Sequence, residues 1–159
     1  MHSLVAAVIL EKLACALASS PRPVVCEASD FSSVALLEYL NRALEIRHNL
    51  LGPLHVDTVE NLATIAAMYM RWEHYSNAQE TYSEVLLLRR AIFGCDRTGM
   101  EHPSVAVTAH MLGQVHARLS QRDKAVEYFQ MAERIYSALK LPTGNPSFVS
   151  LQRDLNQYQ

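Results

Sequence analysis

The sequence predicts an all-α fold, a right-handed α-solenoid of about three helical hairpins followed by a C-terminal capping helix. Its internal repetition is the first reason. Segment 44–52 returns 42 residues later as 86–94, and segment 62–85 returns 47 residues later as 109–132. Repeats of this length are typical of hairpins that stack and bury one face against the next. The second reason is that apolar residues recur at helical spacing, with none of the alternation typical of strands.

Length and composition favour a single domain, 1–159, that carries its own hydrophobic core. Half of the 159 residues are hydrophobic, which is enough for a core without disulfides or metal. Lys and Arg together number 14 against 16 Asp and Glu, a net charge of -2. This balance gives no electrostatic reason to expect nucleic acid or an anionic membrane as partner.

The cysteines indicate a reducing compartment. Cys15, Cys26 and Cys95 are odd in number and stand at unrelated spacings. They match neither a disulfide framework nor a zinc site. A cytoplasmic location is the expectation that follows.

The N-terminal segment has two interpretations. Val5, Ile9, Leu13 and Leu17 form an apolar stripe at fourfold spacing, which predicts a helix packed through these residues. The apolar run and the small residues after it also resemble a secretory signal, but Lys12 and its acidic neighbour interrupt the run and no positive charge precedes it. No apolar stretch reaches the roughly 18 residues of a membrane span.

Helix boundaries follow from prolines, glycines and capping residues. Seven helices are expected, over residues 3–19, from a cap at Asp30 or Ser32 to 50, and over 56–71, 75–93, 103–119, 122–139 and 147–158. The longest loop, 19–30, contains Pro21 and Pro23. Gly52 and Gly94 suit left-handed helix ends, whereas Pro103 and Pro146 suit first helical positions. The helices group into hairpins 3–50, 55–94 and 102–141, with 147–158 as the capping helix.

Small residues mark the expected helix crossings. Ala66 precedes Ala78 by the same interval that separates Gly113 from Ala125. Helices that pack about 8–10 Å apart leave no room there for a large side chain. Large residues such as Phe129 fill the spaces between turns. This order matches the tetratricopeptide pattern, W-x2-L-G-x2-Y followed by A-x3-F.

Three groups of residues carry a more specific family resemblance. They are Arg42-Ala43-Leu44-Glu45-Ile46-Arg47, the helix-end element Leu51-Gly52-Pro53-Leu54-His55, and Ala67-Met68-Tyr69 with Tyr75, Ala78 and Tyr82. With them, most of residues 31–141 resembles the 42-residue tetratricopeptide repeats of kinesin light chains and related adaptor proteins. The resemblance implies a groove that binds extended peptides of partner proteins.

Two departures from the family pattern bear on the groove. Kinesin-light-chain repeats carry an Asn-Asn pair that bonds the backbone of a bound peptide, whereas Ala63-Thr64 and His110-Met111 stand at the matching positions here. A five-residue insertion also lies between Gly94 and His102, within segment 95–100. We expect these extra residues to lengthen a surface loop, which the fold tolerates.

The first helix of each hairpin is expected to line the concave side, and the capping helix to continue the line. The predicted groove residues are Ala63, Ala67, Met70, Arg71, His110, Gln114, Ala117, Arg118 and Arg153. Four of them, His110 and the three arginines, suggest a basic strip that receives acidic groups of a partner, because Arg makes forked contacts to carboxylates. The alternative is that the arginines are solvated or pair with neighbours such as Glu73 and Asp123.

Residues for catalysis or metal binding are not arranged as a site. No cysteine or serine stands near a histidine with an acidic orienting residue, and no Gly-rich phosphate loop is present. His110 and His116 point to different helix faces, so His116 is expected in the core, and His55 and His102 are expected to brace turns. The sequence predicts no enzyme, no metal and no cofactor.

Three functions fit these observations. The first is an interaction module, an adaptor or scaffold that holds a partner peptide or helix in its groove. The second is a structural piece, a fragment of a longer solenoid or one that self-associates. The third is a non-catalytic accessory region of a larger protein, because some SET-domain lysine methyltransferases end in similar hairpins.

Overall fold

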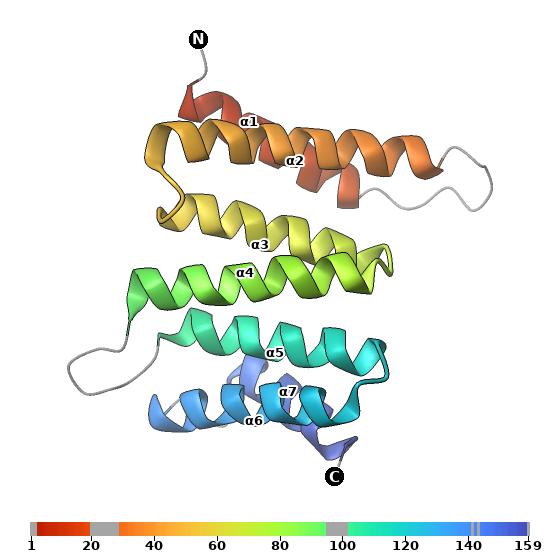
Figure 1. Cartoon of the computed structure of the whole chain (residues 1–159), viewed down its shortest axis with the longest axis vertical. Coiled ribbons are helices and arrows are strands. Elements are labelled where there is room, and N and C mark those ends of the chain that lie inside the picture. Colours follow the sequence, from red (N-terminus) through yellow and green to blue (C-terminus); the bar gives the residue numbers. More distant parts are fainter. Residues whose placement is uncertain (1–2, 20–28, 95–101, 141, 143, 159) are drawn as a thin grey trace. The chain divides into compact units, whose positions relative to one another are not determined.

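The computed structural model describes residues 3–19, 29–94, 102–140, 142 and 144–158 (Figure 1). Within these ranges every regular element is an α-helix. The helices are α1 Leu4–Ser19, α2 Ser29–Leu51, α3 Val56–Arg71, α4 Tyr75–Phe93, α5 Pro103–Arg118, α6 Arg122–Ala138 and α7 Pro146–Asn156. The predicted all-α class is confirmed. The predicted helix bounds agree to within two residues, except that α2 begins at Ser29, before both predicted caps, Asp30 and Ser32. The loop 19–30 and the insertion 95–100 lie largely outside the described residues, as do the side chains of Cys15, Cys26 and Cys95.

Helix ends form where the sequence predicts them. Gly52 and Gly94 follow α2 and α4 with φ of 87° and 56°, in the left-handed region that glycine adopts without steric cost. Pro103 and Pro146 are the first residues of α5 and α7. Proline suits this position because its missing N–H would have no helical partner.

The same capping geometry begins α3, α5 and α7. The side chains of His55, His102 and Asn145 each accept a hydrogen bond from the backbone N–H two residues on, at 3.2, 3.2 and 3.0 Å. Each bond satisfies one of the N–H groups that lack a partner at a helix start. His102 also stacks on Phe93, with ring centroids 4.0 Å apart. The expectation that His55 and His102 brace turns is confirmed.

The chain divides into two compact units, Met1–Ile65 and Ala66–Gln159. In the first unit, α1 packs on α2 through Ala7, Ala43 and Ile46. Arg47 is buried there and pairs with Glu11, with 2.5 Å between Nη2 and Oε2. With its amide oxygen turned toward the guanidinium, the fully buried Asn61 accepts from Arg47 Nη1 at 2.9 Å.

The prediction that α1 packs through its apolar stripe is wrong. Val5, Ile9 and Leu13 are 65%, 52% and 49% exposed; the side chain of Leu17 lies outside the described residues. The small residue Ala7 faces α2 instead, where it lets the backbones approach, and Glu11 follows one turn later to meet Arg47. Side-chain size and an ion pair therefore decide which face of this largely apolar helix is buried.

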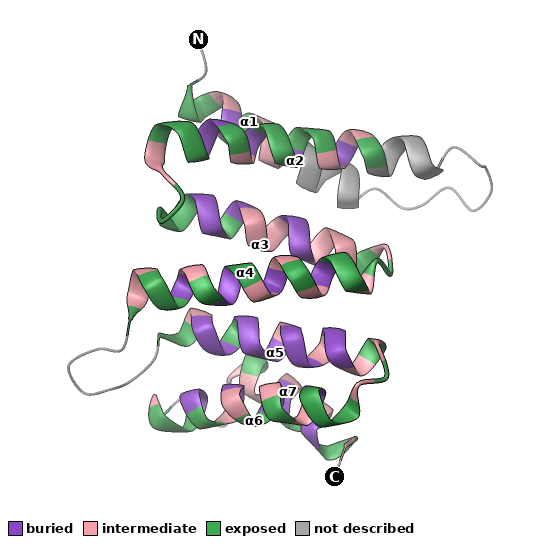
Figure 2. Cartoon of the chain, in the orientation of Figure 1, coloured by how far each residue is buried: buried purple, intermediate pink, exposed green. Residues whose placement is uncertain are grey.

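The second unit holds the larger core, contributed mainly by α4, α5 and α6 and closed by Leu151 and Leu155 of α7. Figure 2 shows buried residues along most of α5. Ala66, Ala78 and Ala125 have no exposed surface, and Gly113 is buried as well. The prediction of small residues at closely packed positions is confirmed. A Cβ atom on Gly113 would lie only 2.4 Å from the ring of Phe129.

Candidate functional site

A groove of about 560 Å³ opens on the second unit, between residues of α3, α5, α6 and the end of the chain. Its lining residues are Met70, Gln114, Ala117, Arg118, Phe129, Asp154, Gln157 and Tyr158. We call it the α5 groove. The first four of these residues are groove residues predicted from the sequence. The structure therefore brings together part of the predicted site.

One face of α5 forms a wall of this groove. Gln114, Ala117 and Arg118 stand three or four residues apart, which places them on the same side of the helix. The opposite side of α5 is fixed in the core by residues such as Leu112 and Val115, both fully buried. The core thus sets the orientation of the groove wall.

His110 does not belong to an open basic strip, and this part of the prediction is corrected. It is 3% exposed, and its Nε2 atom lies 2.8 Å from Asp154 Oδ2. Gln114 Nε2 donates to the same carboxylate oxygen at 2.7 Å. Asp154 of α7 thus occupies the acceptor position that the prediction gave to a partner, and it holds α7 against α5.

The three predicted arginines remain at the surface. Arg71, Arg118 and Arg153 are all exposed, and the structure gives them no ion pair or side-chain hydrogen bond with any residue that it describes. The alternative pairing with Glu73 or Asp123 is not seen among those residues. Arg118 lines the α5 groove directly. These cations are available to a ligand in this unit.

The two predicted alanines of α3 are half-buried. Ala67 belongs to the same unit as the α5 groove, whereas Ala63 belongs to the first unit. Neither lines the groove. Of the predicted α3 residues, only Met70 does.

Sequence reasoning missed the contribution of the chain's end. Asp154, Gln157 and Tyr158 line the groove, although Arg153 was the only predicted groove residue in this segment. Arg122 Nη2 donates to the Tyr158 carbonyl at 2.7 Å, and the Tyr158 ring lies 6.0 Å from that of Phe129. The spacing of 154, 157 and 158 on one helical face was the signal that could have revealed this wall.

Two buried arginines, near the ends of α2 and α4, were also missed. Arg89 is 6% exposed, and its Nη1 atom donates to the Ser104 carbonyl at 2.9 Å and to Thr108 Oγ1 at 2.6 Å. Arg47, its equivalent 42 residues earlier, is equally buried and reaches Asn61 in its own unit. Since Asn61 and Thr108 are themselves equivalent in the repeat, the same device anchors α2 to α3 and α4 to α5. The repeated Arg at the helix end was the available signal.

His116 is a core residue, as predicted. It is 3% exposed, its Nδ1 atom lies 2.8 Å from Gln121 Oε1, and its ring stacks on Tyr128 at 5.2 Å. Among the residues described, no three His, Cys, Asp or Glu side chains are placed to hold a metal ion. Over the same residues, no helix has both the length and the apolar character needed to cross a membrane.

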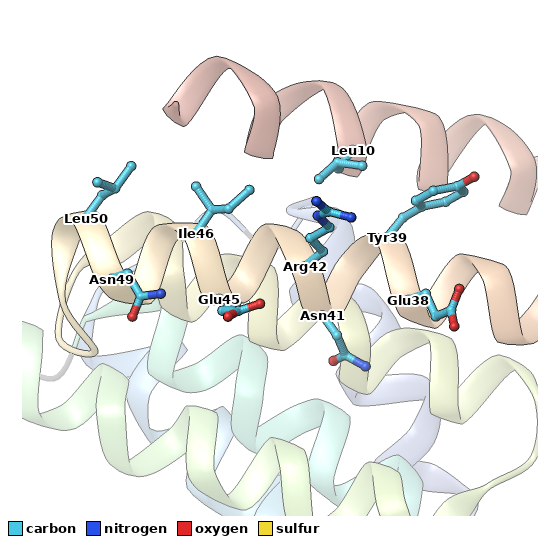
Figure 3. Close-up of a pocket in the computed structure, with 9 residues that line it drawn as sticks. All are labelled: Leu10, Glu38, Tyr39, Asn41, Arg42, Glu45, Ile46, Asn49 and Leu50. Carbon is cyan, nitrogen blue, oxygen red and sulfur yellow. The ribbon is translucent and has the colours of Figure 1, made fainter. Parts of the chain in front are cut away.

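A second groove, of about 890 Å³, lies on the first unit beside α1 and α2. Figure 3 shows its lining residues, which are Leu10, Glu38, Tyr39, Asn41, Arg42, Glu45, Ile46, Asn49 and Leu50. We call it the α2 groove. None of its residues was among the predicted groove residues.

Solved structures resemble this chain in fold. A crystal structure of BtubC (BKLC) from P. vanneervenii matches 88% of the chain with a TM-score of 0.69 at 20% identity. Two structures of a putative kinesin light chain from Podosopora anserina, described as nearly identical TPR-like repeats, each match 96% of it, with TM-scores of 0.59 and 0.58 at 20% and 19% identity. The chain has the tetratricopeptide-like repeat fold.

This tetratricopeptide-like chain spans 50% of the BtubC chain, and 74% and 75% of the two P. anserina chains. No protein-family model matches it, and no curated protein sequence does either. At these identities the likeness establishes the α-solenoid class of the fold. The predicted resemblance to kinesin-light-chain-type repeats is confirmed at that level.

Proposed function

We propose that this chain is a protein–protein interaction module that holds a partner peptide or helix in the α5 groove. The observation that carries the proposal is the groove itself, a volume of about 560 Å³ that brings together Met70, Gln114, Ala117 and Arg118. Apolar and polar groups share its lining, as is usual where a peptide is both buried and oriented. Tetratricopeptide-like repeats generally serve protein binding, which supports the same assignment.

The partner is acidic near its point of contact. Arg118 lines the groove, and Arg71 and Arg153 are exposed on the same unit without a charge partner among the described residues. Among the described residues that line the groove, Asp154 supplies the one carboxylate, and it is already bonded by His110 and Gln114. A carboxylate of the partner therefore gains the guanidinium of Arg118, which pairs with no described residue.

A peptide array tests this function. We expect the native chain to retain acidic peptides of about ten residues and not their Asp→Asn and Glu→Gln counterparts. For one retained peptide, fluorescence anisotropy then gives Kd for the native chain and for Arg71→Glu/Arg118→Glu. Charge reversal is expected to weaken binding about tenfold or more, because each like-charge contact costs about 1 kcal/mol or more.

Lys124→Glu is the matched control, since Lys124 is an exposed cation of α6 that does not line the α5 groove. It changes the net charge by half as much as the double variant and should leave Kd within about twofold. Equal loss in the control would mean that binding follows net charge alone. Retention of every peptide by Arg71→Glu/Arg118→Glu would overturn the assignment of the site.

The proposed role is an adaptor or scaffold without a catalytic step or cofactor. The side chains of the α5 groove include neither a cysteine nor a serine nucleophile, and its aspartate is engaged by two partners in the chain. We place the protein in the cytoplasm, a reducing setting that suits three cysteines at unrelated spacings.

A further inference from the structure

Exposed aliphatic side chains gather on one face of α1. Val5, Ile9 and Leu13, one turn apart, are 65%, 52% and 49% exposed, and Leu4 and Val8 beside them are 42% and 40% exposed. We call these five residues the α1 ridge. Single exposed apolar residues are ordinary on protein surfaces, whereas a continuous run marks an interaction surface.

The α2 groove adjoins α1, because Leu10 of α1 is part of its lining (Figure 3). Its apolar lining continues along α2 through Tyr39, Ile46 and Leu50, of which Tyr39 is 37% and Leu50 51% exposed. A ridge that presents one aliphatic residue per turn suits a groove lined at helical spacing. One hairpin thus carries both a ridge and a groove.

The charges of the two surfaces are complementary. Lys12 is the exposed charged residue of α1 next to the ridge, and no described residue pairs with it. The other charged residue there, Glu11, forms an ion pair with Arg47. The α2 groove has two carboxylates, Glu38 and Glu45, against one guanidinium, so it carries a net negative charge.

We propose that this face is a twofold interface between two copies of the chain. The α1 ridge of each copy lies in the α2 groove of the other, with Lys12 facing Glu38 and Glu45. A second copy is the occupant because one chain carries both complementary surfaces, and a twofold axis makes every such contact twice. A largely apolar helix is stable when most of its surface is buried, and the interface covers the side of α1 that α2 leaves open.

Molar mass by size-exclusion chromatography with light scattering tests this interface. The native chain, injected over a concentration series, is expected to give twice the mass of the 17.9 kDa chain. Lys12→Glu, and separately Glu38→Lys/Glu45→Lys, place like charges opposite each other and should each weaken the dimer about tenfold or more. Far-UV circular dichroism checks that both variants keep their helices, as substitutions of exposed residues should.

An equimolar mixture of the two variants gives the decisive result. In a mixed dimer, Glu at position 12 faces the new lysines on one side of the axis, and native Lys12 faces native Glu38 and Glu45 on the other. The mixture should therefore recover the dimer that each variant alone has lost. This charge rescue depends on which surfaces meet, so a general loss of stability cannot produce it.

Three outcomes would overturn the proposal. They are a monomeric native chain at all concentrations, a dimer that both variants leave intact, and a mixture that stays monomeric. A monomer that co-sediments with phosphatidylserine vesicles through the α1 ridge would assign the ridge to a lipid surface instead. Peptide binding in the α5 groove is measured separately, on Lys12→Glu, so failure of either proposal leaves the other to its own test.

Discussion

Gly113 illustrates how one residue sets the distance between two helices. It is buried in α5, directly against the ring of Phe129 in α6. Because the ring occupies the space of a Cβ atom, glycine here permits an approach that alanine would block. The gain in helix propensity from alanine, about 1 kcal/mol, does not offset that overlap.

Gly113→Ala is therefore expected to destabilise the protein by about 1–3 kcal/mol. Urea unfolding followed by circular dichroism measures the free energy of unfolding. Gly113→Ala combined with Phe129→Leu provides the control, because the smaller side chain yields space to the added methyl group. If the single variant were more stable than the native chain, helix propensity would outweigh packing and the close approach would not constrain these helices.

Tyr82 predicts a loss of stability at alkaline pH. Burial raises the pKa of Tyr82 from 10.0 to about 12, and the positive charge of Arg89 opposes part of that rise. The unfolded chain loses the phenol proton near the ordinary pKa, whereas the folded chain keeps it. The resulting stabilisation is complete below about pH 10 and is lost as the pH rises through about 12.

Urea unfolding at about pH 9 and about pH 11 measures this effect. The native chain should lose stability between the two, and Tyr82→Phe should lose less, because it has no phenol proton to release at this position. Burial also raises the pKa of Tyr136, so part of the pH dependence remains in the variant. An identical loss in both proteins would show that Tyr82 ionises equally in the folded and unfolded states.

At the scale of the element, α4 is fastened to α5 by a buried cation. Arg89 donates to the Ser104 carbonyl and to Thr108 Oγ1 on consecutive turns of α5. Such bonds are stronger than those between neutral groups. Without Arg89, Thr108 Oγ1 loses the donor from which it accepts, whereas the Ser104 carbonyl still accepts from Thr108 Oγ1 at 2.9 Å. Arg89→Met keeps the length of the side chain and removes its donors.

Arg89→Met should lower the free energy of unfolding by about 2–3 kcal/mol, as measured in urea. Arg134→Met is the control, since Arg134 is an exposed arginine of α6, and its substitution should change stability by less than about 0.5 kcal/mol. Equal effects of the two substitutions would mean that the buried contacts contribute no more than an exposed arginine.

The helices could be predicted because their signals are local. Glycine, proline and capping side chains fix where α2, α5 and α7 begin or end within a few residues of the boundary. The buried side of α1 could not be predicted in this way. Most of its side chains are apolar, so the choice of face depended on Ala7 and Glu11 meeting partners in α2 that are distant in the sequence.

At the scale of the whole molecule, the α5 groove was predictable on the wall that repeats. Gln114, Ala117 and Arg118 follow from the periodicity of α5. The opposite wall comes from α7, whose sequence is outside the clear repeats, and its contact to His110 joins residues 44 positions apart. Periodicity describes residues near one another in sequence, so it could not reveal that contact.

Binding through exposed arginines predicts a dependence on salt. The affinity for an acidic peptide should fall roughly fivefold or more between about 0.1 M and 1 M NaCl, as the Debye length shortens from about 10 to about 3 Å. Fluorescence anisotropy of one labelled peptide over this series measures it. Sodium fluoride at the same ionic strengths controls for specific chloride binding, and a salt-independent Kd would show that apolar contacts dominate the affinity.

The shared caps of α3, α5 and α7 have a consequence for how such a chain can lengthen. Each start is encoded within three adjacent positions, by His55, His102 or Asn145 and the amide that it binds. A duplicated block of DNA that includes such a triplet brings its own initiation signal with it. A duplicated hairpin therefore starts its own helix without a change of sequence in the neighbouring hairpins.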